Sequence, residues 1–336
     1  MEKSGYIKLL ITGFSILFIT ICFTACKKTE NPIKYPKGTF PDSVINIADI
    51  NSSYDDYNLA LYQIGENLPI IFSSNRKSSG GQFDLEQARI SKLFDQTSGV
   101  FGFWASMTTD AFTDKLITKA KTPGNDFGPY RLFSKIDGFE YLLLSSTNGT
   151  GNLDFYYLKN QPVSGAFNPE ITGPSPIKLM NTGSDDAYIC FNSEHDTAYF
   201  SSNKEGTFDI FFLKKPAEED LASWFNLDYS PPAKVDSLNS SGEDKCPFVL
   251  KKIMVFASNR TGGLGGYDLY YSNFKNGKWA SPVNFGPRIN TSSDEYRPVI
   301  GSQPGFANKY LIFSSTRPGG KGGFDLYFTG VDIPTK

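Results

Sequence analysis

Residues 254–271 read MVFASNRTGGLGGYDLYY, and the same pattern occurs five times in the chain. In each copy an apolar strand ends in a Ser-rich turn containing Gly, after which an aromatic residue or Leu precedes Asp and a second apolar run. The copies occupy residues 70–85, 141–155, 198–210, 254–271 and 311–328. Their aspartates, Asp84, Asp154, Asp209, Asp268 and Asp325, are separated by 70, 55, 59 and 57 residues. Such a spacing holds one four-stranded propeller blade.

A second phrase precedes each copy. It starts with Asn or Lys followed by Ser or Thr, and it ends in a polar pair whose second member is acidic, at residues 51–56, 121–126, 181–186, 239–244 and 290–295. Asn, Ser and Asp bond their own backbone in turns, so this phrase predicts the connection between blades. Pro129, Pro247 and Pro298 follow the acid by three residues, where a fixed backbone angle would help to start the next strand.

The last copy lacks a fourth strand. Residues 43–50 resemble residues 282–289, which include the fourth strand of the preceding repeat, and they stand before the first connecting phrase. We therefore predict an all-β, five-bladed β-propeller whose ring is closed by this N-terminal strand, because closure removes exposed sheet edges. Six blades is the weaker alternative. The first repeat is longer, and we interpret its excess, residues 96–114, as a loop or an irregular outer strand.

Composition agrees with this fold class. Aromatic residues make up 15% of the chain, which also has 31 Gly and 20 Pro, as expected for short strands joined by tight turns. We expect no long amphipathic helix after the N-terminal segment. The net charge is −2, and lysines and arginines are dispersed among the acids, so neither nucleic-acid binding nor a polybasic membrane patch is indicated.

The N-terminus has the features of a secretion signal. Lys3 and Lys8 precede or flank an apolar run over residues 9–23, which ends in Thr24, Ala25 and Cys26. The run is short for a membrane span, which needs about 20 residues, and a transmembrane helix is the alternative. Residues 23–26, Phe-Thr-Ala-Cys, resemble the bacterial lipobox, which implies lipid on Cys26; an ordinary secretory signal is the other alternative.

These features predict three regions: a lipoprotein signal peptide over residues 1–25, the lipidated Cys26 with a flexible tether to residue 41, and a propeller over residues 42–336. Lipid would tether the chain to a membrane without spanning it. We expect an outer-membrane lipoprotein facing either the periplasm or the cell surface. Replacing Cys26 with Ala should release the protein from the membrane fraction into the soluble fraction, as measured by fractionation and immunoblotting. A variant that stays membrane-bound contradicts lipid anchoring.

The remaining titratable residues give little sign of chemistry. Cys190 and Cys246 are the only cysteines in the predicted folded part, and they are either a disulfide or two small buried hydrophobic residues. The one histidine, His195, lies in a polar turn, so we predict no Ser-His-Asp triad and no zinc site. We expect no cofactor. Calcium on the five repeated aspartates is the weaker interpretation, because one Asp per turn is poor coordination and Asp there is better suited to fixing the hairpin.

The acids of the connecting phrase are better candidates for a site. They open the innermost strand of each blade, so they should converge near the mouth of the central channel and could bind a cation or a cationic partner. Capping of the connecting turn is the alternative, and fivefold repetition favours it because catalytic acids need unlike environments. We assign no catalytic residue. The five acids are Asp56, Asp126, Asp186, Asp244 and Glu295.

The Ser-Asn-Arg…Gly-Gly-x-Asp-Leu-Tyr phrase, clearest over residues 258–270 and good over 314–327, resembles the WD-like repeats of TolB-type propellers. That resemblance covers residues 43–333 and implies a platform for protein contacts in the bacterial envelope. It therefore predicts a non-enzymatic lipoprotein that binds an envelope protein, with the membrane reached through the lipid anchor.

Carbohydrate binding or hydrolysis in the axial cavity is the alternative function, because five-bladed propellers also include arabinanase-type glycosidases. A cavity lined by unlike carboxylates and exposed aromatic residues would favour it. Adjacent acids such as Asp55 and Asp56 point to opposite faces of a strand, so no adjacent pair forms the two catalytic carboxylates by itself. Five aromatic residues could stack on sugars or fill the space between blades: Phe103, Trp104, Trp224, Phe225 and Trp279.

Overall fold

The computed structural model describes residues 33–61, 67–108, 110–148, 151–161 and 170–334. The proposed signal peptide and Cys26 lie outside these residues. The chain divides into a small unit, described over residues 33–36 and 95–100, and a larger unit that starts at Lys37 and contains all the strands. In the small unit the amides of Lys34 and Tyr35 both donate to the Gln96 carbonyl. Among the described residues, no helix is long and apolar enough to span a membrane.

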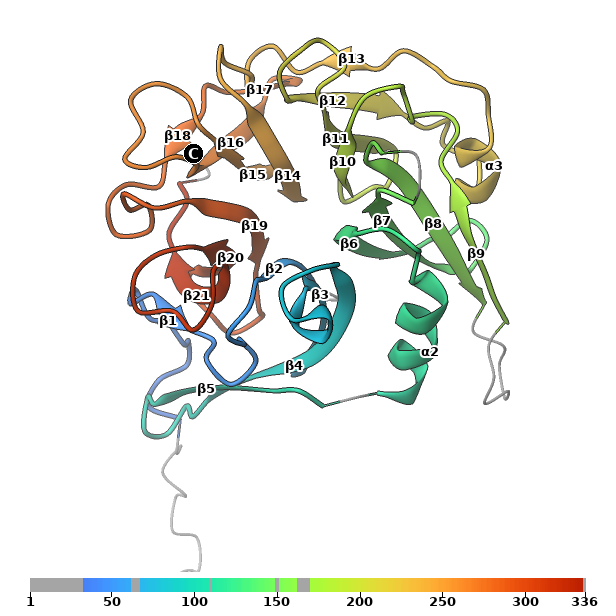
Figure 1. The fold of residues 1–336 in the computed structure, drawn as a ribbon. Helices are drawn as coiled ribbons and strands as arrows, with labels where there is room; N and C mark the ends of the chain where they lie inside the picture. Colours follow the sequence, from blue (N-terminus) through green and yellow to red (C-terminus); the bar gives the residue numbers. More distant parts are fainter. Residues whose placement is uncertain (1–32, 62–66, 109, 149–150, 162–169, 335–336) are drawn as a thin grey trace, which may run out of the picture. The chain divides into compact units, whose positions relative to one another are not determined.

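The larger unit is a ring of five antiparallel sheets around one axis, with the first strand of each sheet innermost (Figure 1). Each of these sheets is one blade of a β-propeller, and the predicted fold class and blade count are confirmed. The first blade comprises β2 (Asp56–Leu61), β3 (Asn67–Ser74), β4 (Asp84–Phe94) and β5 (Phe101–Ser106). The second comprises β6 (Asp126–Phe133), β7 (Glu140–Ser146), β8 (Asp154–Gln161) and β9 (Glu170–Pro176).

The other three blades follow the same order along the chain. The third comprises β10 (Asp186–Phe191), β11 (Thr197–Ser202), β12 (Asp209–Lys214) and β13 (Ala233–Lys234). The fourth comprises β14 (Asp244–Leu250), β15 (Ile253–Ser258), β16 (Asp268–Lys275), β17 (Lys278–Trp279) and β18 (Val283–Asn284). The fifth comprises β19 (Glu295–Gly301), β20 (Lys309–Ser315), β21 (Asp325–Val331) and the N-terminal β1 (Ile45–Asn46). Every innermost strand begins at the acid of the connecting phrase, and every third strand begins at the repeated Asp.

The N-terminal strand closes the ring, as predicted. β1 pairs with β21 through Ile45 opposite Phe328 and Asn46 opposite Tyr327. The folded unit also includes residues that we assigned to the tether. Phe40 is fully buried, its amide donates to Asn308 Oδ1 at 2.8 Å, and its ring stacks on Phe306 with centroids 3.9 Å apart.

Asparagine side chains join neighbouring blades. In four blades the Asn that opens the connecting phrase accepts from, and donates to, the backbone of one residue in the third strand of the preceding blade, with distances of 2.8–3.0 Å. In the other blade Lys121 takes this place, and its Nζ donates to Asp84 at 2.7 Å. The connecting phrase therefore joins two blades, because the side chain of its first residue bonds to the preceding blade. The four asparagines are Asn51, Asn181, Asn239 and Asn290.

Two helices differ from the expectation of an all-strand domain. α2 (Ala111–Ala120) follows β5 and is capped by Asp110, whose side chain accepts from the Phe112 amide at 3.1 Å. It buries Leu116, Ile117 and Ala120, a spacing that places them on one helix face. The excess of the first repeat therefore contains a regular outer strand, β5, and the start of a helix. The short helix α3 (Leu221–Phe225) lies between the third and fourth strands of the third blade, β12 and β13.

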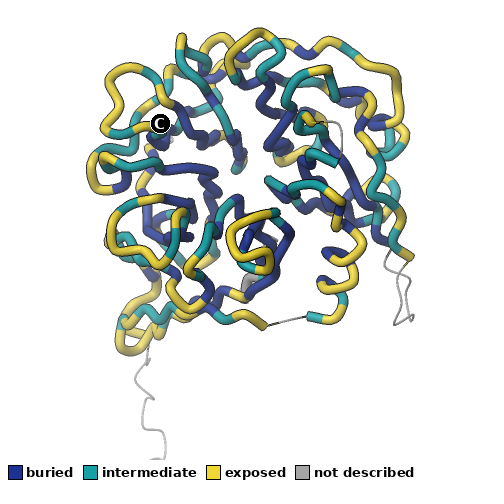
Figure 2. Tube along the Cα trace, in the orientation of Figure 1, coloured by how far each residue is buried: buried dark blue, intermediate teal, exposed yellow. Residues whose placement is uncertain are grey.

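The core lies within and between the blades, where the tube in Figure 2 is almost continuously buried along the inner strands. Cys190 and Cys246 are both buried and free, so they behave as small hydrophobic residues rather than as a disulfide. Burial raises the pKa of the two thiols, to about 12 for Cys190 and about 11 for Cys246, which keeps both protonated.

Candidate functional site

The five acids expected at the channel mouth are enclosed rather than open to it. Each has no exposed surface. The Asp244 carboxylate accepts from the amide and the hydroxyl of Ser240 at 2.6 and 2.9 Å, and the other four make the same pair of bonds to the Ser or Thr four residues earlier. They cap the connecting turns because the bonded pair is local in sequence. Their positions leave no surface for a ligand.

The arginine of the Ser-Asn-Arg phrase completes this arrangement in three blades. Arg260 Nη2 lies 2.5 Å from Asp244 and also donates to the Leu238 carbonyl at 2.6 Å. Arg76 pairs with Asp56 and Arg317 with Glu295 in the same way. In the third blade Lys204 stands at this position and pairs with Glu205 instead. Burial raises the pKa of Asp186 to about 6, and no cation among the described residues pairs with this carboxylate.

The repeated aspartates at the start of each third strand hold hairpins or outer strands. Asp268 accepts from the amides of Leu264 and Gly265, and Asp325 accepts from those of Lys321 and Gly322, at 2.6–3.2 Å. Asp84 and Asp209 accept from Lys121 and Lys234 respectively. Among the described residues, no three His, Cys, Asp or Glu side chains are grouped so that they could hold a metal ion.

The five innermost strands share one bulge position, at which their side chains differ. Each has a β-bulge whose residue adopts a positive φ of 46–63°. The prolines expected to start these strands lie next to this residue, inside the bulge, because a bulge leaves an amide without a ladder partner. The five positions carry unlike side chains around the axis, and they are Asn58, Gly128, Tyr188, Cys246 and Arg297.

A pocket of about 380 Å³ opens at the axis beside these bulges. Its walls come from the first, third, fourth and fifth blades, so no single repeat forms it. Two residue types dominate the lining: acids that precede the capping acid, and aromatic residues of the two repeated phrases. The lining residues are Asp55, Tyr57, Phe83, Tyr188, Lys245, Tyr267, Asp294, Tyr296 and Phe324.

The aromatic rings form a connected wall. Tyr57 contacts Phe83 and Phe324 with centroids 5.1 and 5.4 Å apart. Tyr296 contacts Tyr267 and Phe324 at 5.2 and 6.0 Å. Burial raises the pKa of Tyr57, Tyr188, Tyr267 and Tyr296, so their hydroxyls are neutral hydrogen-bonding groups over the ordinary pH range.

Two pocket carboxylates are held by the neighbouring blade. Asp55 Oδ1 accepts from the Phe324 amide and Asp294 Oδ1 from the Tyr267 amide, each at 2.8 Å. In the second blade Asn125 Oδ1 makes the same bond to the Phe83 amide at 2.9 Å. The structural bond therefore needs an oxygen acceptor but no charge.

Glu243 is not among the lining residues, but its carboxylate bonds to two of them, Lys245 and Tyr267. Its Oε2 lies 2.8 Å from Lys245 Nζ and accepts a hydrogen bond from the Tyr267 hydroxyl. Partial burial opposes ionisation, but these two hydrogen bonds outweigh it and lower the pKa of Glu243. The carboxylate is thus ionised and partly exposed, with a cation on one side and an aromatic ring on the other.

The aromatic residues singled out from the sequence lie elsewhere. Trp224, Phe225 and Trp279 are buried between or beside blades. Phe103 packs on Phe328 with centroids 4.5 Å apart, and Trp104 is 48% exposed on β5. Sequence reasoning missed the pocket aromatics, although the signal was present. An aromatic residue precedes four of the five repeated aspartates, and an aromatic residue follows three of the five capping acids.

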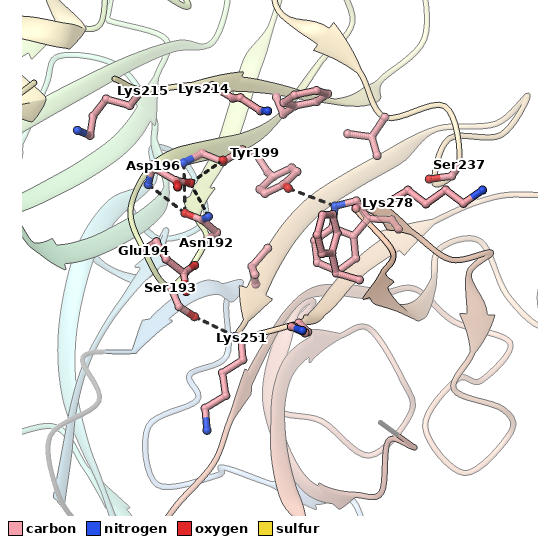
Figure 3. Close-up of a pocket in the computed structure, with 18 of the residues that line it drawn as sticks. Asn192, Ser193, Glu194, Asp196, Tyr199, Lys214, Lys215, Ser237, Lys251 and Lys278 are labelled. Atoms are coloured by element: carbon pink, nitrogen blue, oxygen red, sulfur yellow. Dashed lines mark hydrogen bonds between the residues drawn. The ribbon is translucent and has the colours of Figure 1, made fainter. Parts of the chain in front are cut away.

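A second cavity of about 770 Å³ lies between the third and fourth blades, and Figure 3 shows its lining. Tyr199 and Trp279 form part of its floor, and Trp279 Nε1 donates to the Tyr199 hydroxyl at 3.3 Å. Polar residues surround them, and Asn192 Nδ2 donates to Asp196 at 2.6 Å. Its acids Glu194, Asp196 and Asp236 lie on exposed loops. The axial pocket is the stronger candidate because its carboxylates are half-buried among aromatic rings.

Comparison with solved structures finds a similar fold in several glycoside hydrolases. No family model matches the chain, and no curated protein matches it. A thermostable family-43 glycoside hydrolase aligns with a TM-score of 0.52 and 12% identity, covering 84% of this chain and 94% of its own. An endo-arabinase from Bacteroides thetaiotaomicron gives 0.52 and 12%, covering 86% and 97%. A β-xylosidase, RS223, gives 0.52 and 10%, covering 87% and 96%.

These likenesses establish the five-bladed fold and correct three expectations. The TolB-type assignment is wrong, because the solved propellers that align with this chain above are glycoside hydrolases rather than TolB-type repeat proteins. The expected role as a protein-interaction platform depended on that assignment and falls with it. The expectation of a non-enzymatic protein is overturned on the same ground. The assignment was misled by the repeated turn residues, which stabilise the turns of the propeller and do not indicate the function of one family.

Proposed function

We propose that this chain is a carbohydrate-active propeller that binds a glycan in the axial pocket and hydrolyses it there. The observation that carries the proposal is an aromatic-lined pocket with two partly exposed carboxylates, Asp55 and Asp294, and a third, Glu243, bonded to its lining residues Lys245 and Tyr267. Its volume falls in the range of small-molecule sites, about 300–1,000 Å³. Aromatic faces suit the apolar faces of sugar rings, and carboxylates accept strong hydrogen bonds from hydroxyl groups.

Hydrolysis of a glycosidic bond needs two carboxyl groups, one as acid and the other as base or nucleophile. Glu243 suits the second role, because its lowered pKa keeps it ionised. Asp55 and Asp294 are the candidates for the first role. The endo-arabinase and the β-xylosidase with this fold support arabino- and xylo-oligosaccharides as the first substrates to test.

The test removes charge from the pocket without disturbing the fold. In Asp294→Asn the side-chain oxygen can still accept from the Tyr267 amide, as Asn125 does for Phe83. Losing a charged hydrogen bond of about 1.5–3 kcal/mol should weaken glycan binding about 10–100-fold. Release of reducing ends should fall at least as far. Calorimetry and a reducing-end assay on the same oligosaccharides measure the two effects.

Asp185→Asn is the matched control. Asp185 occupies the same position in the third blade and accepts from the Leu153 amide at 2.9 Å, but it does not line the axial pocket. It should leave binding and reducing-end release unchanged. Equal losses in the two variants would contradict the axial pocket as the site. If the wild-type chain binds the oligosaccharides but releases no reducing ends, the proposal of hydrolysis is contradicted and the proposal of carbohydrate binding is supported.

A further inference from the structure

Arg297 is a buried charge at the propeller axis. It is the bulge residue of β19, with a φ of 46°, and it is 1% exposed. Its guanidinium reaches toward other blades: Nη2 donates to the Pro129 carbonyl at 3.3 Å, and Cζ lies 5.4 Å from the centre of the Tyr188 ring. The side chain thus contacts the second and third blades, and the tyrosine that it contacts also lines the axial pocket.

No acid balances this charge. Among the described residues Arg297 forms no ion pair, whereas Arg76, Arg260 and Arg317 each pair with a buried carboxylate and Arg131 pairs with Glu140. The thiols of Cys190 and Cys246 interact electrostatically with Arg297, but both are protonated because burial raises their pKa. Burying an unpaired ion costs several kcal/mol, which is why buried charges in proteins are almost always compensated.

Two of the three guanidinium nitrogens also have unused donors. Neither Nε nor Nη1 of Arg297 has a hydrogen-bond partner among the described residues. Asn58 occupies the equivalent bulge of the adjoining first blade and is fully buried. Neither its amide nitrogen nor its amide oxygen has a hydrogen-bond partner among the described residues. More than nine in ten buried polar groups are hydrogen-bonded, so two such residues at equivalent positions of adjoining blades form an exceptional concentration of free donors.

We propose that the propeller axis binds a small monovalent anion, of the size of chloride, against the Arg297 guanidinium. The anion supplies the missing negative charge and accepts from Nε or Nη1. The Asn58 amide is the candidate for a further donor. This site is separate from the proposed carbohydrate function, because it uses the interior of the ring and requires no glycan.

The test uses the full chain, with chloride or bromide exchanged against gluconate at constant ionic strength. Gluconate is much larger than a halide ion and serves as the reference anion. Above the dissociation constant, each tenfold increase in halide should raise Tm by about 2–4 °C, because the anion binds the folded state alone. Arg297→Met should abolish this dependence, whereas Arg89→Met, at an exposed residue of β4, should retain it.

Diffraction from bromide-containing crystals tests the wild-type chain directly and does not depend on whether Arg297→Met folds. An anomalous peak within hydrogen-bond distance of Arg297 Nε or Nη1 supports the site. Water alone at both nitrogens, or the same Tm in halide and gluconate, overturns the proposal. Glycan binding is not needed for either readout, so failure of the anion site and failure of the carbohydrate proposal are distinguishable.

Discussion

Replacing Phe40 with Ala is expected to lower the free energy of unfolding by about 3–5 kcal/mol, the cost of truncating a fully buried Phe. Phe40 has no exposed surface and lies among four other rings, Phe101, Phe306, Tyr310 and Phe328. It precedes β1, the strand that closes the ring on β21. Truncation therefore leaves a cavity where the N-terminal segment packs on the last blade. Chemical denaturation followed by tryptophan fluorescence measures the change.

Phe133→Ala is the control for this experiment. Phe133 is 42% exposed at the end of β6, so its truncation should cost well under half as much as that of Phe40. If both substitutions lower the unfolding midpoint by the same small amount, the segment around Phe40 does not contribute to ring closure. The ring would then depend on the short β1 pairing alone.

Replacing Arg260 with Met should also destabilise the protein by about 3–5 kcal/mol, because it leaves one partner of a buried ion pair uncompensated. Asp244 has no exposed surface, and Arg260 is its only cation among the described residues. The same substitution removes the bond to the Leu238 carbonyl, which ties the blade to its connecting turn. The free energy of unfolding at pH 7 is the quantity to compare with wild type.

This loss should depend on pH in a defined direction. An unpaired, buried carboxylate in this position resembles Asp186, whose pKa burial raises to about 6. A folded-state pKa above the unfolded value means that the folded state binds more protons, so stability falls as pH rises between the two values. The destabilisation in Arg260→Met should therefore be largest above pH 6 and shrink as the pH is lowered toward 4. A loss that does not vary with pH would contradict the buried charge as its cause.

Lys204→Met is the matched control, because Lys204 stands at the corresponding position of the third blade. Its partner is the exposed Glu205, at 2.9 Å, and not the capping acid Asp186. A surface ion pair contributes about 0–1 kcal/mol, so the control should change stability by no more than that. A loss equal to that of Arg260→Met would show that the effect comes from the shared position rather than from the buried pair.

The repeat was readable from the sequence because its interactions are local. Each capping acid bonds the Ser or Thr four residues earlier, and Asp268 and Asp325 bond amides three and four residues earlier. Such short-range bonds leave the same residue types at the same spacing in every copy. The helix α2 was missed because it occurs once, so no second copy marked it as regular structure.

The sequence by itself determined the five blades, the position of each innermost and third strand, and the closure by residues near 45. These follow from local turn chemistry repeated along the chain and from one strand that has no partner in its own repeat. Only the tertiary structure decided the candidate sites. Asp55 and Phe324 meet although 269 residues separate them, and Arg297 lies against Pro129, 168 residues earlier in the chain. The axial pocket and the buried guanidinium depend on such long-range meetings at the axis, where unlike residues from equivalent positions come together and no spacing along the sequence records their contact.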